Sequence, residues 1–268
     1  MTESVGAAMD IRFGATVAEF MRYVTDLGLD HVELKREYLA GHPDTPDPEG
    51  IRELSDRHGV SVTYHAPFRD WNLGSYDEVV RQDSVERVKR TLDDAADAGA
   101  EAVVVHGGSV PRRYPEWVRE QARANAGLSL AECAEYAQLL GVPLCLENQP
   151  FDEDKRRYTT TPADLASMLE AVDVTPKYFG VTLDVGHANV TGEDWRAFVG
   201  EFGDQIRVCH LHDNDGTADQ HEPLPDYEPL VEAIPADHFV FEMKSVDNIA
   251  TSVGSDDTPP ELGAPGRE

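Results

Sequence analysis

Short apolar runs alternate with amphipathic segments along the whole chain. The runs are rich in β-branched and aliphatic residues, and Ala102-Val103-Val104-Val105 is continuous, which is typical of strands buried on both faces. The pattern predicts strands near residues 10–13, 31–34, 61–64, 102–106, 143–147, 180–184, 207–210 and 238–242.

Helical segments with recognisable start and stop signals separate these strands. The stretches at 17–27, 76–98 and 115–140 each end just before a glycine, which is a common helix C-cap, although a glycine inside the third could break it. A fourth stretch, at 161–172, opens with Thr-Pro, an N-cap residue followed by proline at the first helical position.

Strand and helix alternate eight times over about 240 residues, which is the pattern of a (β/α)8 TIM barrel. A doubly wound open sheet would give the same alternation, and periodicity alone does not separate the two. We predict a single-domain α/β barrel over residues 1–253. Residues 254–268 are rich in Gly, Pro and acidic residues, and we predict a disordered tail there.

Polar residues that bear chemistry lie where the predicted strands end. One such residue alone is usually structural, but six successive strands finish this way, at His65, His106, Glu147, Asp184, His210 and Glu242. The C-terminal strand ends of a barrel share one rim, where active sites lie. Burying a carboxylate there is costly without positive charge, and most of these ends lack Lys or Arg. A divalent cation (Mn²⁺, Mg²⁺, Co²⁺ or Zn²⁺) is the economical counter-charge, with Glu147, Asp184, His210 and Glu242 as its candidate ligands.

Further candidate residues lie near the same strand ends. Asp219 and His221 form an Asp-x-His pair, which with His187 could bind another metal or substrate hydroxyls, or could be an exposed loop pair. Lys244 lies two residues after a candidate ligand, on the same strand face, and could bind an anionic group or pair with a carboxylate. Trp71 could be a lid or a sugar-stacking platform, or could pack in the ordinary way.

The net charge is −28, from 23 basic and 51 acidic residues, and the acid is dispersed. Lys is scarce, at five against eighteen Arg, a combination typical of salt-accumulating halophiles, so we expect a halophilic archaeal source. The charge then reports the solvent and does not by itself exclude nucleic acid. No apolar stretch reaches the roughly 18 residues of a membrane helix, and residues 1–10 lack signal-peptide features. With three cysteines, too few for a disulfide framework, we expect a cytoplasmic protein with reduced thiols.

An ordered set of motifs resembles the xylose-isomerase-like barrel superfamily over about residues 10–245: His65-Ala-Pro, His106-Gly-Gly, Glu147-Asn, Asp184-Val-Gly-His187, His210-Leu-His-Asp-Asn-Asp and Asp219-Gln-His221. That superfamily holds sugar and sugar-phosphate isomerases and epimerases, and DNA-repair nucleases of the endonuclease IV type. The resemblance implies a metal held by Glu147, Asp184, His210 and Glu242. In the nuclease branch, up to three zinc ions would also use His65, His106, His187, Asp219 and His221. All nine residues are present, so the number of ligands does not decide the branch.

The residues around the ligands favour the isomerase/epimerase branch. The nuclease pattern Asp-Thr-Cys-His is replaced here by Asp184-Val-Gly-His, and His-Leu-Asn-Asp-Ser by His210-Leu-His-Asp-Asn-Asp-Gly. One departure touches both branches, because the usual Gly-x-Gly after the Asp-x-His pair is replaced by Leu-Pro-Asp-Tyr at 224–227. The shape of that loop, and its effect on activity, are left open.

We predict a metal-dependent sugar or sugar-phosphate isomerase/epimerase. Glu147 and Glu242 would move a proton at the carbon next to a carbonyl, through an enediolate. The alternatives are an abasic-site nuclease of the endonuclease IV type and a non-catalytic ligand-binding barrel. The expected partner is a small sugar or polyol. Nucleic acid is disfavoured, membrane association is not expected, and the sequence leaves the oligomeric state open, a homo-oligomer included.

Overall fold

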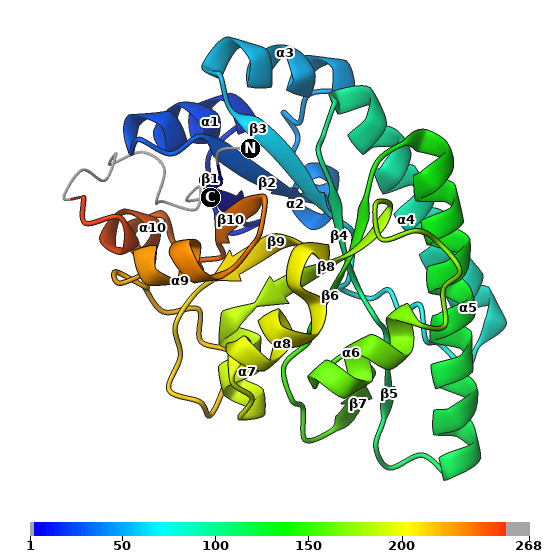
Figure 1. Ribbon diagram of the computed structural model, residues 1–268. Coiled ribbons are helices and arrows are strands. Elements are labelled where there is room, and N and C mark those ends of the chain that lie inside the picture. Colours follow the sequence, from blue (N-terminus) through cyan, green and yellow to red (C-terminus); the bar gives the residue numbers. More distant parts are fainter. Residues whose placement is uncertain (1–2, 256–268) are drawn as a thin grey trace, which may run out of the picture.

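Eight parallel strands close into a barrel in the computed structural model, which describes residues 3–255 (Figure 1). β1 pairs with β2 on one side and with β10 on the other, so the sheet has no edge and the predicted TIM barrel is confirmed over the open sheet. Around the barrel the strands follow the order β1 (Ser4–Met9), β10 (His238–Phe241), β9 (Ile206–Leu211), β8 (Phe179–Asp184), β6 (Leu144–Glu147), β4 (Val103–His106), β3 (Ser61–His65) and β2 (His31–Lys35).

The helices pack around the outside of this barrel (Figure 1). The longest is continuous through the glycine that could have broken it, and the Thr-Pro start of α6 is an N-cap as predicted. The α-helices are α1 (Val17–Asp26), α2 (Arg36–Gly41), α3 (Pro48–His58), α4 (Glu78–Ala98), α5 (Glu116–Leu140), α6 (Pro162–Leu169), α7 (Val185–Thr191), α8 (Trp195–Phe202), α9 (Glu228–Ala233) and α10 (Val246–Ser252).

The first predicted strand, near residues 10–13, is wrong. The strand is β1, which ends before Asp10, and Ile11 is 50% exposed in the turn after it. The segment Ser-Val-Gly-Ala-Ala-Met contains small residues with little strand propensity, so it does not stand out by pattern. The correction matters because it places Asp10 at the C-terminal end of a barrel strand.

Two loops after barrel strands form a small antiparallel pair that the sequence did not predict. β5 (Ser109–Pro111) comes after β4, β7 (Lys155–Arg157) comes after β6, and Pro111 lies opposite Lys155 in their register. Each strand has three residues, too few to show an alternating pattern. The pair lies on the same rim as the strand ends that carry the candidate residues.

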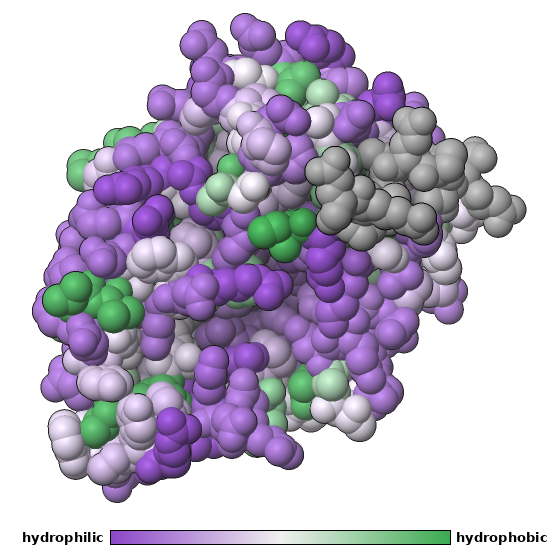
Figure 2. All heavy atoms as spheres, turned by 180° about the vertical axis from the view of Figure 1, so that it is seen from behind, coloured by the Kyte–Doolittle hydropathy of each residue, from purple (hydrophilic) through white to green (hydrophobic). Residues whose placement is uncertain are grey.

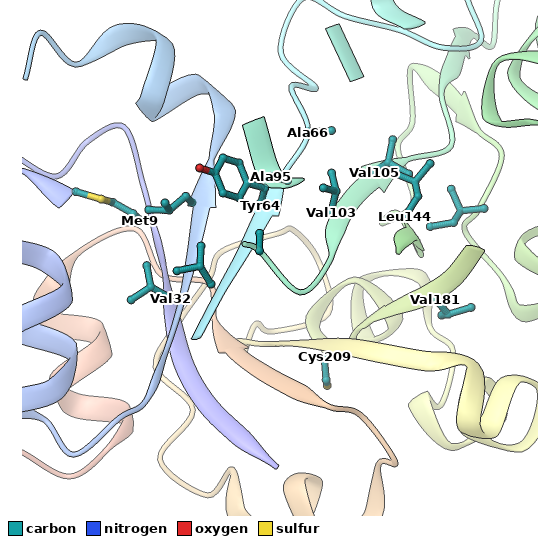
Figure 3. Packing of buried hydrophobic residues seen from close by; sticks show 14 of the residues in the cluster. Met9, Val32, Tyr64, Ala66, Ala95, Val103, Val105, Leu144, Val181 and Cys209 are labelled. Atoms are coloured by element: carbon teal, nitrogen blue, oxygen red, sulfur yellow. The ribbon is translucent and has the colours of Figure 1, made fainter. Parts of the chain in front are cut away.

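The core has two layers, one on each face of the barrel. The larger layer lies between strands and helices, and Figure 3 shows part of it, with Val32, Tyr64, Val103 and Val181 from four strands. The smaller layer contains Ala8, Ala102, Val104, Cys145, Val208 and Val240, which alternate with residues of the larger layer and therefore face the barrel interior. The next inward positions, two residues further along five of these strands, are polar: Asp10, His106, Glu147, His210 and Glu242.

Three further predictions concern the C-terminal tail, the cysteines and membrane-spanning helices. The predicted disordered tail lies outside the described residues except for Gly254 and Ser255. The three cysteines are buried and free, as expected of reduced thiols. Over residues 3–255, no helix is both long and apolar enough to cross a membrane.

The close approach of β1 to β2 gives a stability prediction. A Cβ at Gly6 would lie 1.8 Å from the carbonyl oxygen of His31, which is backbone and has little room to move. We expect Gly6→Ala to lower the free energy of unfolding by about 3 kcal/mol, measured by urea denaturation at constant high salt. Gly200→Ala is the control, because a Cβ there meets nothing within 4 Å and alanine favours the α8 helix by up to about 1 kcal/mol. Equal stability of the two variants would contradict the β1–β2 register.

Candidate active site

The C-terminal ends of the barrel strands surround one end of a cavity of about 710 Å³. Register brings the candidate residues together in neighbouring pairs: His106 lies opposite Glu147, and Asp184 lies opposite His210. A parallel sheet aligns its strand ends on one rim, so residues up to 207 positions apart come within hydrogen-bonding distance there.

The four predicted metal ligands form one compact, buried group. Glu147, Asp184, His210 and Glu242 each offer one ligand atom, and these atoms lie within 4.8 Å of one another. The Nδ1 atom of His210 lies 3.2 Å from Glu147 Oε1, 3.7 Å from Asp184 Oδ2 and 3.8 Å from Glu242 Oε2. Such a group of three carboxylates and one imidazole could hold a divalent cation.

The other predicted residues gather around this group. His106 Nε2 lies 2.8 Å and His65 Nε2 3.3 Å from the same oxygen of Glu147, and these three form a second group with metal-ligand spacing. On the other side, Asp219 Oδ2 lies 3.1 Å from His221 Nε2 and 3.5 Å from His187 Nε2. The structure therefore brings all nine predicted residues together, and the Asp-x-His pair is not an exposed loop pair.

The electrostatics of the group fit a cation site. Burial raises the pKa of Glu147, but His106 and His210 lower it well below its ordinary value. Burial lowers the pKa of His187, but the carboxylates of Asp184, Asp219 and Glu147 raise it to about 10. The carboxylates thus draw positive charge towards them. Asp219 Oδ1 is also buried without a hydrogen-bond partner among the described residues, an acceptor that a cation would satisfy.

Two buried charges on β2 were not predicted from the sequence. The Lys35 ammonium forms an ion pair with Glu242, and although burial lowers its pKa, Glu242 raises it above the ordinary value. Glu33 Oε2 lies 3.2 Å from His210 Nε2, on the edge of the ring opposite to the Nδ1 atom that faces the other candidate ligands. The signal was present, because polar residues at 31, 33 and 35 alternate with apolar ones and share the inward face.

His212 was also missed, and it explains a glycine in a neighbouring motif. Its Nε2 lies 3.1 Å from Asp184 Oδ1, and its ring is buried. A Cβ at Gly186 would lie 2.0 Å from the His212 ring, so only glycine leaves room for it. Each of the two motifs that depart from the nuclease pattern therefore has one changed position, Gly186 in the first and His212 in the second, that lies against the other motif.

Local hydrogen bonds hold Asp184 and His187 in place. Asp184 is the N-cap of α7 and accepts a 2.7 Å hydrogen bond from the backbone N–H of His187. The Asn148 side chain accepts from the Asp184 N–H at 2.7 Å and donates to the Asp184 carbonyl at 2.9 Å. The strand-to-helix turn therefore presents both side chains to the same group.

The altered loop at 224–227 leaves the Asp-x-His pair in the site. A β-bridge between Asp213 and Glu222 closes the segment that carries the pair, and the Leu224 N–H donates to Ser252 Oγ at 3.0 Å. His221 has a positive φ of 57°, which is uncommon for a residue other than glycine and is often found at functional sites. The loop difference thus alters the residues after the pair and leaves the contacts of the pair intact.

The two weaker candidates both line the cavity. The Arg87 guanidinium lies over the Trp71 ring, with its carbon 4.7 Å from the centre of the ring, so Trp71 already has a packing partner. Lys244 Nζ donates to the backbone carbonyl of Asp219 at 2.7 Å and not to a carboxylate. β10 ends at Phe241, so the assumption that Lys244 continues the strand is wrong, although it still faces the cavity.

Comparison with known proteins extends these observations. A family model described as xylose isomerase-like TIM barrel matches residues 21–257. An uncharacterized protein of Methanocaldococcus jannaschii is 34% identical over 173 residues, 64% of this chain and 57% of that protein, so the match spans less than two thirds of this relative. Fructoselysine 3-epimerase of Escherichia coli O157:H7 is 24% identical over 216 residues, 75% of this chain and 72% of the enzyme.

A solved structure supports the same assignment. The crystal structure of a D-tagatose 3-epimerase-like protein superposes with a TM-score of 0.78 and 27% sequence identity, covering 93% of this chain and 94% of that one. The family model, the closed barrel and the rim of acidic and histidine side chains agree. The chain belongs to the xylose isomerase-like TIM barrel family.

Proposed function

We propose that this protein is a divalent-metal-dependent sugar or sugar-phosphate isomerase/epimerase that moves a proton at the carbon next to a carbonyl. The observation that carries the proposal is the buried group of Glu147, Asp184, His210 and Glu242, of which Glu147 and Glu242 line a cavity large enough for a sugar. Relatives and structural neighbours named as sugar epimerases support the reaction class.

A cation would be held by these four residues. Mn²⁺, Mg²⁺, Co²⁺ and Zn²⁺ all suit their oxygen and nitrogen donors. When bound, such an ion stabilises negative charge that develops on the oxygen of the substrate carbonyl.

Glu147 and Glu242 are the proposed proton-transfer residues, because their surroundings differ. Histidines surround Glu147, whereas Glu242 has Lys35 as its partner. One carboxylate removes the proton next to the carbonyl, and the other returns a proton, which for epimerisation arrives on the opposite face. His187, which contacts the Asn148 carbonyl and the Asp219 carboxylate, would orient a substrate hydroxyl.

The second candidate function is an abasic-site nuclease with up to three metal ions. The observation in its favour is a second group of the nine residues with metal-ligand spacing, His65, His106 and Glu147, while the groups that contain His187, Asp219 and His221 also need His212. Against it stand the departures from the nuclease motifs after Asp184 and His210, of which Gly186 and His212 are in contact with each other. A third alternative is a barrel that binds a ligand without metal or catalysis. We also propose a cytoplasmic location, which the free, buried cysteines support.

Isotope exchange tests the proposed reaction. We expect the metal-loaded protein, at high salt in deuterated water, to exchange a C–H proton of one or more ketoses, aldoses or inososes, observed by NMR. Glu147→Gln and Glu242→Gln should each slow exchange by about 100-fold or more, because a positioned acid/base is lost. Glu201→Gln, at an exposed position of α8, is the control. Metal analysis of each variant separates lost proton transfer from lost metal, and no exchange across the whole panel would remove the proposal.

Metal stoichiometry separates the candidate functions. We expect about one tightly bound ion per chain by elemental analysis, whereas the nuclease would hold about three. Removal of the ion by a chelator should lower Tm, because a ligand that binds only the folded state stabilises it. Asp219→Asn should leave a single ion in place but would reduce three ions to two. Incision of abasic duplex DNA that Glu147→Gln abolishes would reverse the ranking.

A further inference from the structure

The cavity wall carries more basic residues than the chain as a whole would suggest. Three of the five lysines in the sequence line it, together with three arginines: Arg12, Lys35, Arg69, Lys155, Arg157 and Lys244. The net charge of the protein is −28, yet a smaller pocket is also rich in basic side chains, with Arg112, Arg119, Arg123 and Arg156 in its lining. The cavity of about 710 Å³ differs from that pocket because two candidate metal ligands, Glu147 and Glu242, line it together with the basic residues.

Only some of these cations have a carboxylate partner. Lys35 pairs with Glu242, Arg12 with Asp10, and Arg157 Nη2 lies 3.2 Å from Asp152 Oδ2. For Arg69, Lys155 and Lys244, by contrast, the structure shows no ion pair with a carboxylate among residues 3–255. The wall therefore offers positive charge that the candidate metal ligands do not neutralise.

The short strand β7 sets the direction of two of these side chains. Lys155 and Arg157 are two residues apart and share a face, which lines the cavity, while Arg156 points the other way and pairs with Asp164 at 2.7 Å. Asp152 Oδ1 accepts from the Lys155 N–H at 2.8 Å, and Arg157 Nη1 donates to the Pro150 carbonyl at 2.9 Å. The pairing with β5 and these hydrogen bonds hold the segment before any ligand arrives.

We propose that Lys155 and Arg157 form a subsite for the phosphate group of a phosphorylated sugar. This inference rests on the proposed function and narrows its substrate class. A phosphate monoester has a charge of about −1.5 to −2 and three acceptor oxygens. Two adjacent basic side chains therefore match a phosphate group better than they match a carboxylate group. Arg69 and Lys244 add to the positive potential that draws such an anion into the cavity.

A small anion fits the distribution of charge better than nucleic acid does. Binding of duplex DNA uses a basic stripe that contacts many phosphates along its backbone. Here the acidic residues are dispersed along the chain, and Figure 2 shows a largely hydrophilic face with small, separate apolar patches. Arg69, Lys155 and Lys244 instead line one cavity, whose volume of about 710 Å³ suits a sugar phosphate.

The test compares ketoses with their phosphate monoesters on the metal-loaded full chain, at constant high ionic strength. We expect kcat/KM for C–H exchange to be at least about tenfold higher for a phosphorylated ketose than for its parent sugar, and inorganic phosphate to compete with it. Lys155→Gln should reduce that preference, and raise the phosphate Kd from calorimetry, by about tenfold, equivalent to roughly 1.4 kcal/mol. Lys177→Gln is the matched control, because Lys177 is exposed just before β8, at the opposite end of the barrel.

The outcomes separate this inference from the proposed function. Exchange of unphosphorylated sugars, with no effect of phosphate and no difference between the two lysine variants, overturns the subsite and leaves the isomerase/epimerase intact. Phosphate binding that only Lys155→Gln weakens, without exchange of any sugar, supports the subsite and removes the proposed function. A preference for sugar carboxylates over phosphates, or abasic-DNA incision that Lys155→Gln abolishes, overturns the assignment to a sugar phosphate.

Discussion

The site depends on carboxylates buried at the C-terminal end of the barrel. Glu147, Asp184 and Glu242 are each at most 5% exposed, and ionised carboxylates at that depth are costly unless positive charge meets them. The chain supplies that charge with Lys35 and a set of histidines, and the remaining demand is what makes the group a candidate metal centre. The histidine contacts, the capping of α7 and the Asn148 hydrogen bonds all serve to hold these three groups.

The barrel meets this demand by changing character along its axis. Small apolar side chains fill the interior at one level, and the next inward position on the same strands is polar. Because strand side chains alternate in direction, positions two residues apart face the same side. The interior therefore changes within two residues from a packed apolar layer to the layer of candidate ligands. The space around Asp184 is so limited that His212 reaches its carboxylate only because Gly186 has no side chain.

Charge acts in this protein at three distances. Dispersed acidic residues give the surface its hydration and the chain its charge of −28. A few buried carboxylates act over hydrogen-bonding distances on histidines and Lys35. Between these distances, the basic residues of the cavity wall act over the width of a substrate, and they offset much of the negative charge of the carboxylates that line the same cavity.

The sequence by itself determined the alternation of strands and helices and most of the polar strand ends, because buried parallel strands are apolar runs and the polar residues that end them stand out locally. The ordered motifs at those ends favoured a barrel over an open sheet. The prediction missed β1, whose small residues carry no strand pattern, and Glu33 and Lys35, whose partners lie on distant strands. Only the tertiary structure decided which strand ends meet, that Gly186 makes room for His212, and that β7 turns Lys155 and Arg157 into the cavity. These depend on closure and register of the sheet, which arise from contacts between residues far apart in the chain and leave no local pattern.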